Sequence, residues 1–524
     1  MELDCLPRRA AWAPLAATLA ALLVACGGGG GGSPAPAPPT TPSTPPVADG
    51  TLADGVVYSS AATGSLASAQ ERAATLKAQL TLNGVGINYT ATTGHLTTVD
   101  ARTGQPAASF FYIAYTADNQ SAATRPVTFM YNGGPGSSTL WLHLGSFGPR
   151  RIVTNQPTLF VPNPVQLVDN AESLLDTTDL VFVDAIGTGF SQAIAPNKNQ
   201  DFWSVDADAA SFRDFVQRYV AANNRQTSPK FLFGESYGAQ RTAVLANLLE
   251  SAGTKLNGIV LLSSILDYNA NCGVFDPNQV SCEGYVPTYA AIGAYHHTAN
   301  PLPTDLNSYL QQARDFASGA YRTAMTPWIA SRTQPPAAVT SQLNAFTGIS
   351  ALVWQQNFDM QPNTFQTVVP GQLTGRYDAR VLAPAGSALA AGGDPSLAVV
   401  NDAFVNTTIS YIAGTLHYTA GSGYVTFNDI VNRWNFSHEG KNVPDTVPDL
   451  AAALTLNPSL KVMSLNGYYD LATPFYQTER DLARLGTNSN ITVRFYQSGH
   501  MAYLDDTARR AIKSDLAAFY ASAR

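Results

Sequence analysis

Ser236 lies in the pentapeptide Gly234-Glu-Ser-Tyr-Gly238, between an apolar run at 231–233 and a helical pattern at 240–249. A strand, a tight glycine-lined turn and a helix in this order form a nucleophile elbow, which exposes a serine hydroxyl at the end of a strand. The helix N-terminus adds a positive field for negative charge developing on a substrate oxygen. The pattern predicts Ser236 as the nucleophile of an acyl transfer; the alternative is a structural serine in a turn.

A serine nucleophile needs a general base and an acid that orients the base. Of the seven histidines, only His500 follows the last predicted strand, in a short loop before the final helical pattern. Asp470 lies just beyond the predicted strand that ends at 465. Both residues follow Ser236 in the order Asp, then His, so we predict a Ser236–His500–Asp470 triad. Asp481, the nearest other carboxylate, falls within a helical pattern and is predicted to be a solvated charge.

A glycine-rich segment, Asn132-Gly-Gly-Pro-Gly-Ser-Ser138, follows the predicted strand 127–131. Its two adjacent glycines leave the backbone free to point N–H groups at an oxyanion. A tight structural turn is the alternative.

Short apolar runs that alternate with amphipathic helical patterns must position these residues. Helical faces are predicted over 209–219 and 508–519. The alternation predicts an α/β fold with a mostly parallel sheet, of the α/β-hydrolase type. From 267 to 449 helical segments and prolines replace this spacing, which predicts a mainly helical cap inserted between core segments 49–266 and 450–524. The predicted strands are 109–115, 127–131, 180–183, 231–233, 258–262, 462–465 and 491–496.

Composition restricts the class of protein. The 524 residues include 30 Lys and Arg against 37 Asp and Glu, and only 13% are charged. This balance argues against a nucleic-acid partner and excludes a disordered, charge-rich chain. His438-Glu439 begins like a zinc motif, but Asn442 stands where the second His belongs. We therefore expect no metal and no cofactor, and no pattern predicts an oligomeric state.

The first 48 residues predict export. Arg8 and Arg9 precede an apolar run at 10–24, which is short for a membrane span but typical of a signal peptide, assigned to 1–25. The run ends Leu23-Val-Ala-Cys26, which resembles a bacterial lipobox whose cysteine becomes lipidated; an ordinary secretory signal is the alternative. Gly28 favours the outer membrane by resemblance to known sorting. Residues 26–48 are Gly- and Pro-rich and predict a tether.

Two cysteines then remain for the folded part, Cys272 and Cys282. In an oxidising compartment they predict a disulfide that contributes about 2–3 kcal/mol by closing a short loop. Two free buried thiols are the alternative.

Five motifs in order resemble the serine carboxypeptidase family, peptidase family S10. They are the Asn132 and Ser236 motifs, Val183-Asp-Ala-Ile-Gly-Thr-Gly-Phe-Ser191, Gly467-Tyr-Tyr-Asp470 and Gly499-His-Met501. The resemblance implies that Ser236, Asp470 and His500 are the triad and that the backbone N–H groups of Gly134 and Tyr237 form the oxyanion hole. It further implies that Asn132 and Glu235 hold the substrate's C-terminal carboxylate, and the large insertion looks like the family's cap.

The chain departs from this family at three places. Where the family has a Glu before Gly148-Pro149, this chain has Ser146 or Phe147. Ser137 replaces a cysteine, and the Asp184 segment is shorter and lacks the usual Gln-Pro. Arg150 or Arg151 could offset the missing carboxylate by binding the substrate C-terminus; a surface arginine pair is the alternative.

Glu235 predicts a preference for acidic pH. Two carboxylates within hydrogen-bond distance cannot both stay charged in a desolvated pocket, so Glu235 and the substrate must share a proton. The favoured interpretation is an exported, lipid-anchored serine carboxypeptidase that acts on peptides. One alternative keeps the triad in an esterase or acyltransferase, and another is an inactive hydrolase-fold protein that binds a ligand at the surface.

Overall fold

A computed structural model of the protein describes residues 47–524, apart from 49, 101–102, 155, 159–160 and 274–279. The predicted signal peptide and the lipidation site Cys26 lie outside the described residues, as does most of the predicted tether. Its last two residues form strand β1 (Val47–Ala48), which pairs with the next long strand. Within the described residues, every helix is too short or too polar to cross a bilayer.

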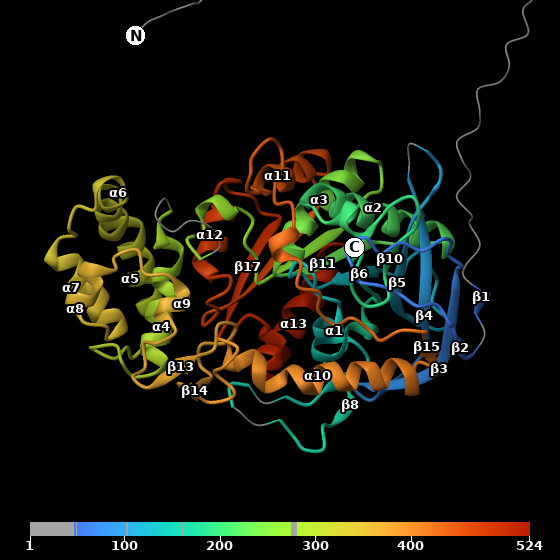
Figure 1. Ribbon diagram of the computed structural model, residues 1–524, viewed down its shortest axis with the longest axis horizontal. Coiled ribbons are helices and arrows are strands. Elements are labelled where there is room, and N and C mark those ends of the chain that lie inside the picture. Colours follow the sequence, from blue (N-terminus) through green and yellow to red (C-terminus); the bar gives the residue numbers. More distant parts are fainter. Residues whose placement is uncertain (1–46, 49, 101–102, 155, 159–160, 274–279) are drawn as a thin grey trace, which may run out of the picture. The chain divides into compact units, whose positions relative to one another are not determined.

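An eleven-stranded sheet forms the centre of the fold (Figure 1). The neighbouring strands from β9 (Asp179–Val183) to β17 (Ile491–Tyr496) in spatial order are parallel, whereas the pairs β3–β4, β4–β5 and β5–β9, which involve β3 (Arg72–Leu82), β4 (Val85–Val99) and β5 (Pro106–Ala117), are antiparallel. All seven predicted strands are confirmed, and four of them are one to five residues longer than predicted. In spatial order the sheet contains β1, β3 (Arg72–Leu82), β4 (Val85–Val99), β5 (Pro106–Ala117), β9 (Asp179–Val183), β6 (Val127–Tyr131), β11 (Lys230–Glu235), β12 (Gly258–Leu262), β16 (Lys461–Gly467) and β17 (Ile491–Tyr496), with β10 (Gln192–Ala193) beside β5.

Helices cover both faces of the sheet. Side chains alternate along each strand, so the apolar strands present apolar side chains to both faces. In β11, Phe231 and Phe233 enter one apolar cluster and Leu232 enters the other. One face is covered by α2 (Val205–Ala222), α3 (Tyr237–Ser251) and α11 (Val447–Leu456), and the other by α1 (Leu140–Leu142), α10 (Pro395–Gly414) and α13 (Asp506–Ser522) (Figure 1). The strands buried on both faces explain the continuous apolar runs in the sequence.

The antiparallel strands β3 and β4 were not among the predicted elements. They are joined by Asn83 and Gly84, which have positive φ values of 50° and 78°. A two-residue Asn-Gly turn of this kind matches the twist of a hairpin. The strands around it are rich in Thr and Ala, so they lack the apolar runs that identified the central strands.

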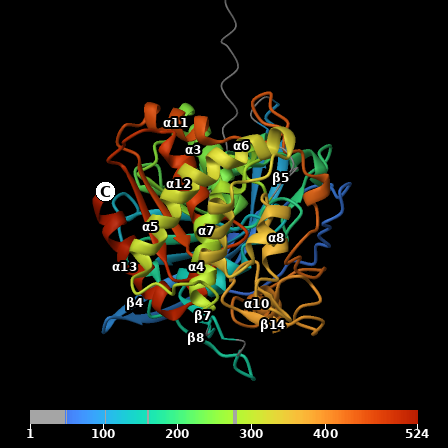
Figure 2. The same ribbon diagram turned by 90° about the vertical axis from the view of Figure 1, so that its left-hand side faces the viewer.

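The chain between β12 and β16 divides into two parts. The first contains α4 (Val286–Tyr295), α5 (Leu306–Phe316), α6 (Arg322–Ser331), α7 (Ala337–Thr347), α8 (Ala351–Gln356) and α9 (Pro362–Phe365), which lie together beside α12 (Phe475–Ala483) and β17 (Figure 1; Figure 2). These helices share an apolar cluster of their own. The predicted disulfide between Cys272 and Cys282 is present next to them, with the two Cα atoms 5.2 Å apart.

The second part of this interval returns to the core. After the hairpin of β13 (Gln372–Thr374) and β14 (Leu382–Pro384), α10 packs on the sheet and β15 (Tyr418–Thr419) pairs with β2 (Leu52–Ala53). Helix α11 packs on the opposite face against α3. A further hairpin, β7 (Arg150–Ile152) with β8 (Leu167–Asp169), lies outside the main sheet. The interval predicted as one cap therefore supplies both a separate helical cluster and a cover for the core.

Candidate active site

Ser236 occupies a strained turn between β11 and α3. Its φ of 61° and ψ of −127° are unusual for a residue with a side chain, and its backbone N–H donates to the Leu262 carbonyl at 2.9 Å. A Cβ on Gly234 would lie 2.1 Å from the Gly238 carbonyl oxygen, and one on Gly238 would lie 3.0 Å from the Tyr131 oxygen. The two glycines of the pentapeptide therefore allow the close approach that the elbow requires.

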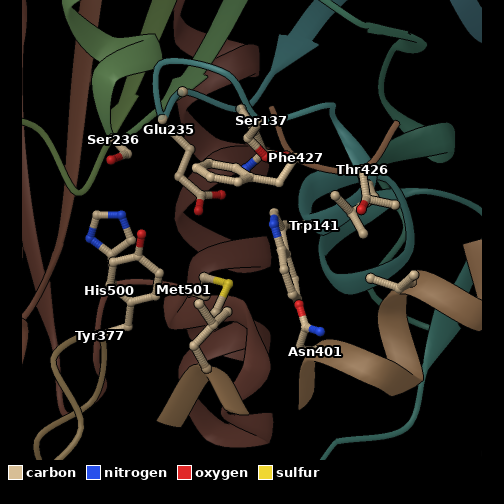
Figure 3. A pocket seen from close by; sticks show the side chains of 16 residues that line it. Ser137, Trp141, Glu235, Ser236, Tyr377, Asn401, Thr426, Phe427, His500 and Met501 are labelled. Carbon is tan, nitrogen blue, oxygen red and sulfur yellow. The ribbon is translucent and has the colours of Figure 1, made fainter. Parts of the chain in front are cut away.

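Asp470 and His500 follow β16 and β17 and form a hydrogen bond. His500 Nδ1 lies 2.7 Å from Asp470 Oδ2, and both side chains are buried. Because the carboxylate accepts, Nδ1 carries the hydrogen and Nε2 is left free to take a proton. Figure 3 shows Ser236 next to the His500 ring, with both side chains at the same cavity. The structure thus brings the three predicted triad residues to one rim of the sheet.

Thr473 also belongs to this group, and it was not predicted. Its hydroxyl donates to Asp470 Oδ2 at 2.5 Å and lies 3.0 Å from His500 Nδ1. The other carboxylate oxygen of Asp470 accepts from the backbone N–H groups of Ala472 and Thr473. An Asp followed three residues later by Thr is a pattern typical of such local bonds, so the sequence contained a signal for this contact.

The insertion holds His500 from its other side. The His500 backbone N–H donates to the Tyr377 carbonyl at 2.6 Å, and the two rings stack with centroids 4.6 Å apart. The His500 carbonyl accepts from the Ser263 hydroxyl at 2.6 Å. A Cβ on Gly499 would lie 2.2 Å from the Tyr377 oxygen, which explains the glycine before the histidine. Tyr377 has no local pattern in the sequence, because a contact across the chain defines its role.

The pKa values of His500 and Glu235 are both shifted. Burial disfavours the imidazolium, but the charge and hydrogen bond of Asp470 outweigh it and raise the pKa of His500 above its ordinary value. Burial raises the pKa of Glu235 to about 7. Tyr503 donates a hydrogen bond to Glu235 Oε2 at 2.8 Å. Glu235 is therefore about half protonated near pH 7, and its protonated form can act as a hydrogen-bond donor.

The Asn132 segment lies directly against the start of α3. A Cβ on Gly133 would lie 2.5 Å from the Tyr237 backbone nitrogen, and Gly134 has a φ of 106°. Arg241 of α3 donates to the Asn132 carbonyl at 2.8 Å and pairs with Asp208 of α2. The backbone nitrogens of Gly134 and Tyr237 thus belong to adjacent segments beside Ser236, which is the arrangement that two oxyanion donors need.

Asp184 fixes the same segment from the opposite side. Its carboxylate accepts from the Thr139 backbone N–H at 2.7 Å and from the Tyr424 hydroxyl at 2.8 Å. Burial raises the pKa of Asp184 to about 6. At Ser137, where the family has a cysteine, a β-bridge to Phe427 joins the loop to the insertion. The Asp184 motif therefore acts on the site by positioning the glycine-rich loop.

The cavity in front of Ser236 encloses about 770 Å³ of empty space, its open mouth included. Ser236 and His500 lie at one end, with the Glu235 carboxyl group next to them, while Trp141, Thr426 and Asn401 lie at the other (Figure 3). Leu140, Leu397, Val405, Phe427 and Met501 complete an apolar lining. A cavity that is mostly apolar with a few convergent polar groups is typical of a small-ligand site.

Other predicted residues lie away from the cavity. Ser146 and Phe147 are buried, and Arg150 pairs with Asp169 at 2.9 Å on the β7–β8 hairpin. Neither Arg150 nor Arg151 lines the cavity, which favours the surface alternative for that pair. The prediction of a solvated Asp481 was wrong: it is buried and accepts from the backbone N–H groups of Leu266 and Asp267, because α12 turns its side chain inward.

His438 also lies away from the cavity, between two carboxylates. Its ring bridges two carboxylates, Asp206 at 2.6 Å and Asp449 at 2.8 Å, which raise its pKa to about 9. Among the residues that the structure describes, no group of three or more His, Cys, Asp or Glu side chains could hold a metal ion. The ring joins the segment after α10 to the first turns of α2 and α11.

A parallel sheet with a serine elbow and a later Asp–His pair defines the α/β-hydrolase class. Within that class the chain belongs to the serine carboxypeptidase family, whose model, Peptidase_S10, matches residues 84–505. This chain is 29% identical to the pheromone-processing carboxypeptidase KEX1 of Candida dubliniensis, over 28% of this chain and 20% of the KEX1 chain. It is 26% identical to serine carboxypeptidase-like 36 of Arabidopsis thaliana over 28% of each.

The fold is also similar to a solved structure. The crystal structure of KEX1(delta)p, a prohormone-processing carboxypeptidase from Saccharomyces cerevisiae, aligns over 82% of this chain and 91% of its own, with a TM-score of 0.51 and 16% identity. At this identity the likeness demonstrates a shared fold. The aligned sequence spans a quarter or less of the KEX1 relatives and 28% of the plant relative.

Proposed function

We propose that this protein is a serine-type carboxypeptidase that removes residues from the free C-termini of peptides. The observation that carries the proposal is the burial of the Glu235 carboxyl group beside the nucleophile. Glu235 is buried, it is adjacent to the nucleophile in sequence, and burial raises its pKa to about 7. A protonated carboxyl group at this position can donate a hydrogen bond to a substrate carboxylate, with Asn132 beside it.

The reaction follows from the geometry of the triad. Ser236 Oγ attacks the scissile carbonyl while His500 Nε2 takes its proton, and Asp470 stabilises the imidazolium. The N–H groups of Gly134 and Tyr237 bind the oxyanion. When the C–N bond breaks, His500 returns the proton to the leaving amine, and an acyl-enzyme remains. Water then attacks the acyl carbon with His500 as base, which releases the shortened peptide and restores the Ser236 hydroxyl.

The pH dependence follows from two groups. His500 must be neutral to act as a base, so activity falls as the pH drops below its raised pKa. Glu235 must be protonated to donate a hydrogen bond to the substrate carboxylate, so activity on free C-termini falls as the pH rises through about 7. Only the second effect depends on the substrate carboxylate.

A pair of matched peptides tests the proposal. The two carry the same residues and differ only in a free or an amidated C-terminus. We expect the free acid to be cleaved at least about tenfold faster at pH 5–6, because only it can bind Glu235 and Asn132. Equal rates on both peptides would contradict the proposal. Turnover of aryl esters with cleavage of neither peptide would favour the esterase alternative. The sequence supports that alternative at one position, because Ser146 and Phe147 stand where the family has a second carboxylate for the substrate C-terminus.

We also propose that residues 1–25 direct export and that Cys26 carries a lipid anchor to the outer membrane. The lipobox-like sequence before Cys26 and the disulfide of Cys272 and Cys282 support an oxidising compartment. Metabolic labelling of the full chain with a fatty acid should mark the protein, and Cys26→Ser should remove the label. Equal labelling of the variant would contradict lipidation at this residue.

A further inference from the structure

We propose that the apolar end of the cavity binds the side chain of the substrate's C-terminal residue and selects large apolar side chains. This proposal rests on the carboxypeptidase function above. Within this end, Asn401 of α10 determines the specificity. The specificity residue thus comes from the returning part of the insertion, not from the strand ends that hold the triad.

Helix α10 presents one stripe to the cavity. Leu397, Asn401 and Val405 follow each other at intervals of four, so they lie on one helical face, and all three line the cavity. Neighbouring positions of α10, Val400, Phe404 and Ile412, belong to the apolar core, and Leu397 and Val405 also pack against it, which fixes the helix in place. The stripe is therefore a rigid wall with a single amide between two apolar side chains.

Trp141 forms the adjoining wall. Its ring packs on Phe404 of α10, with centroids 4.8 Å apart, and faces the cavity together with Met501 (Figure 3). Phe427 closes the mouth and is 56% exposed. Its segment is held to the glycine-rich loop by hydrogen bonds from the Ser138 N–H to the Thr426 carbonyl and from the Asn428 N–H to the Gly136 carbonyl. Aromatic and aliphatic walls of this kind stabilise an apolar side chain by excluding water.

The order of groups along the cavity assigns this end to the leaving residue. Figure 3 shows the Glu235 carboxyl group between His500 on one side and Trp141 on the other. A substrate with its scissile carbonyl at Ser236 and its terminal carboxylate at Glu235 has only one residue between the two. The side chain of that residue then lies nearest the α10 wall.

Charge explains the selectivity. Among the described residues that line the cavity, no Lys or Arg occurs, and Glu235 is the single carboxylate. Glu235 is already engaged by Tyr503 and, under the proposal, by the substrate carboxylate. A Lys, Arg, Asp or Glu side chain at the substrate C-terminus would lose its favourable hydration without gaining an opposite charge on the lining, whereas removing Phe, Leu or Met from water is itself favourable.

The test uses purified protein and a peptide series that differs only in the last residue: Phe, Leu, Lys and Glu. For the wild type we expect kcat/KM on Phe and Leu to exceed that on Lys by about 100-fold or more. Asn401→Asp places a carboxylate on the wall, and the Lys-to-Phe ratio should rise at least about tenfold. Asn406→Asp adds the same charge at an exposed position of α10 and should leave the ratio within about twofold. A second variant, Asn401→Leu, should lower the Lys-to-Phe ratio further.

The outcomes separate the two proposals. Wild-type cleavage of all four peptides at rates within about threefold would overturn the specificity while leaving the carboxypeptidase function intact. Equal shifts from Asn401→Asp and Asn406→Asp would overturn the role of Asn401, as would a shift seen only when the penultimate residue is varied. Cleavage of none of the peptides by protein that still reacts with a fluorophosphonate would instead refute the function on which the inference depends.

Discussion

The two ends of the cavity are built in different ways. At the reacting end, Asp470, Thr473 and His500 are joined by hydrogen bonds of 2.5–3.0 Å, and the groups come from loops after parallel strands. At the α10 end, the walls are mostly apolar, and Asn401 supplies the one amide among the described lining residues of that helix. The comparison teaches that chemistry and selectivity reside in separate parts of the chain. Changes at the first end should reduce turnover on every substrate, and changes at the second should reorder substrates.

The largest effect should come from Asp470→Asn. This change removes the charge that stabilises the His500 imidazolium and fixes its tautomer, so kcat should fall about 10⁴-fold on peptide and ester substrates alike. Asp481→Asn is the matched control, because Asp481 is a buried carboxylate after the same strand that does not line the cavity. Steady-state kinetics on folded protein check both. A similar loss of kcat in the two variants would mean that Asp470 acts as a structural carboxylate and does not stabilise the imidazolium.

Glu235→Gln should change the pH profile more than the maximum rate. Wild-type kcat/KM on a free-acid peptide should fall up to about tenfold per pH unit above pH 7, because Glu235 ionises and repels the substrate carboxylate. The amide of Gln can donate at every pH, so the variant's profile should be flat from pH 7 to 9. Glu439→Gln, at an exposed position, serves as the control. An unchanged decline in Glu235→Gln would refute the shared proton.

Thr473→Val should have a moderate effect that Thr473→Ser restores. Without its hydroxyl, Asp470 loses a donor and interacts more strongly with the imidazolium, so the pKa of His500 should rise. The acidic limb of kcat/KM should therefore move to higher pH, and kcat should fall about tenfold. A Val variant with lower stability but an unmoved acidic limb would assign Thr473 a role in folding alone.

The smallest effect on activity should come from the insertion's disulfide. Replacing Cys272 and Cys282 together by Ala removes a cross-link whose loss costs about 2–3 kcal/mol, or a Tm decrease of about 2–3 °C for a chain of this size. The triad lies outside this loop, so kcat on an ester should stay within about twofold. A loss of turnover without a change in Tm would show that the helical cluster contributes directly to the reacting end.

The same division decides what the sequence could predict. The elbow at Ser236 and the positions of Asp470 and His500 follow from local patterns at the ends of apolar strands, and the structure brings these residues together. Tyr377 and the α10 stripe were not predicted, because a helix with Leu397 and Val405 on one face looks the same whether it covers a core or a cavity. The hairpin at Asn83 was missed although its turn had a clear signal.

Asp481 illustrates the opposite error. Its helical context suggested exposure, yet the inward face of α12 buries the carboxylate against the backbone N–H groups of Leu266 and Asp267. Periodicity alone does not reveal a polar residue that satisfies the backbone of another segment. Such contacts depend on how distant segments meet.

The central claim is that Ser236 is an activated nucleophile, and covalent labelling tests it most directly. Purified protein is treated with a fluorophosphonate and the modified residue is identified by mass spectrometry. We predict one label per chain, on Ser236, which is lost in Ser236→Ala and retained in Ser251→Ala at the exposed end of the same helix. Folded wild-type protein that takes up no label, or that is labelled at another residue, would contradict the account.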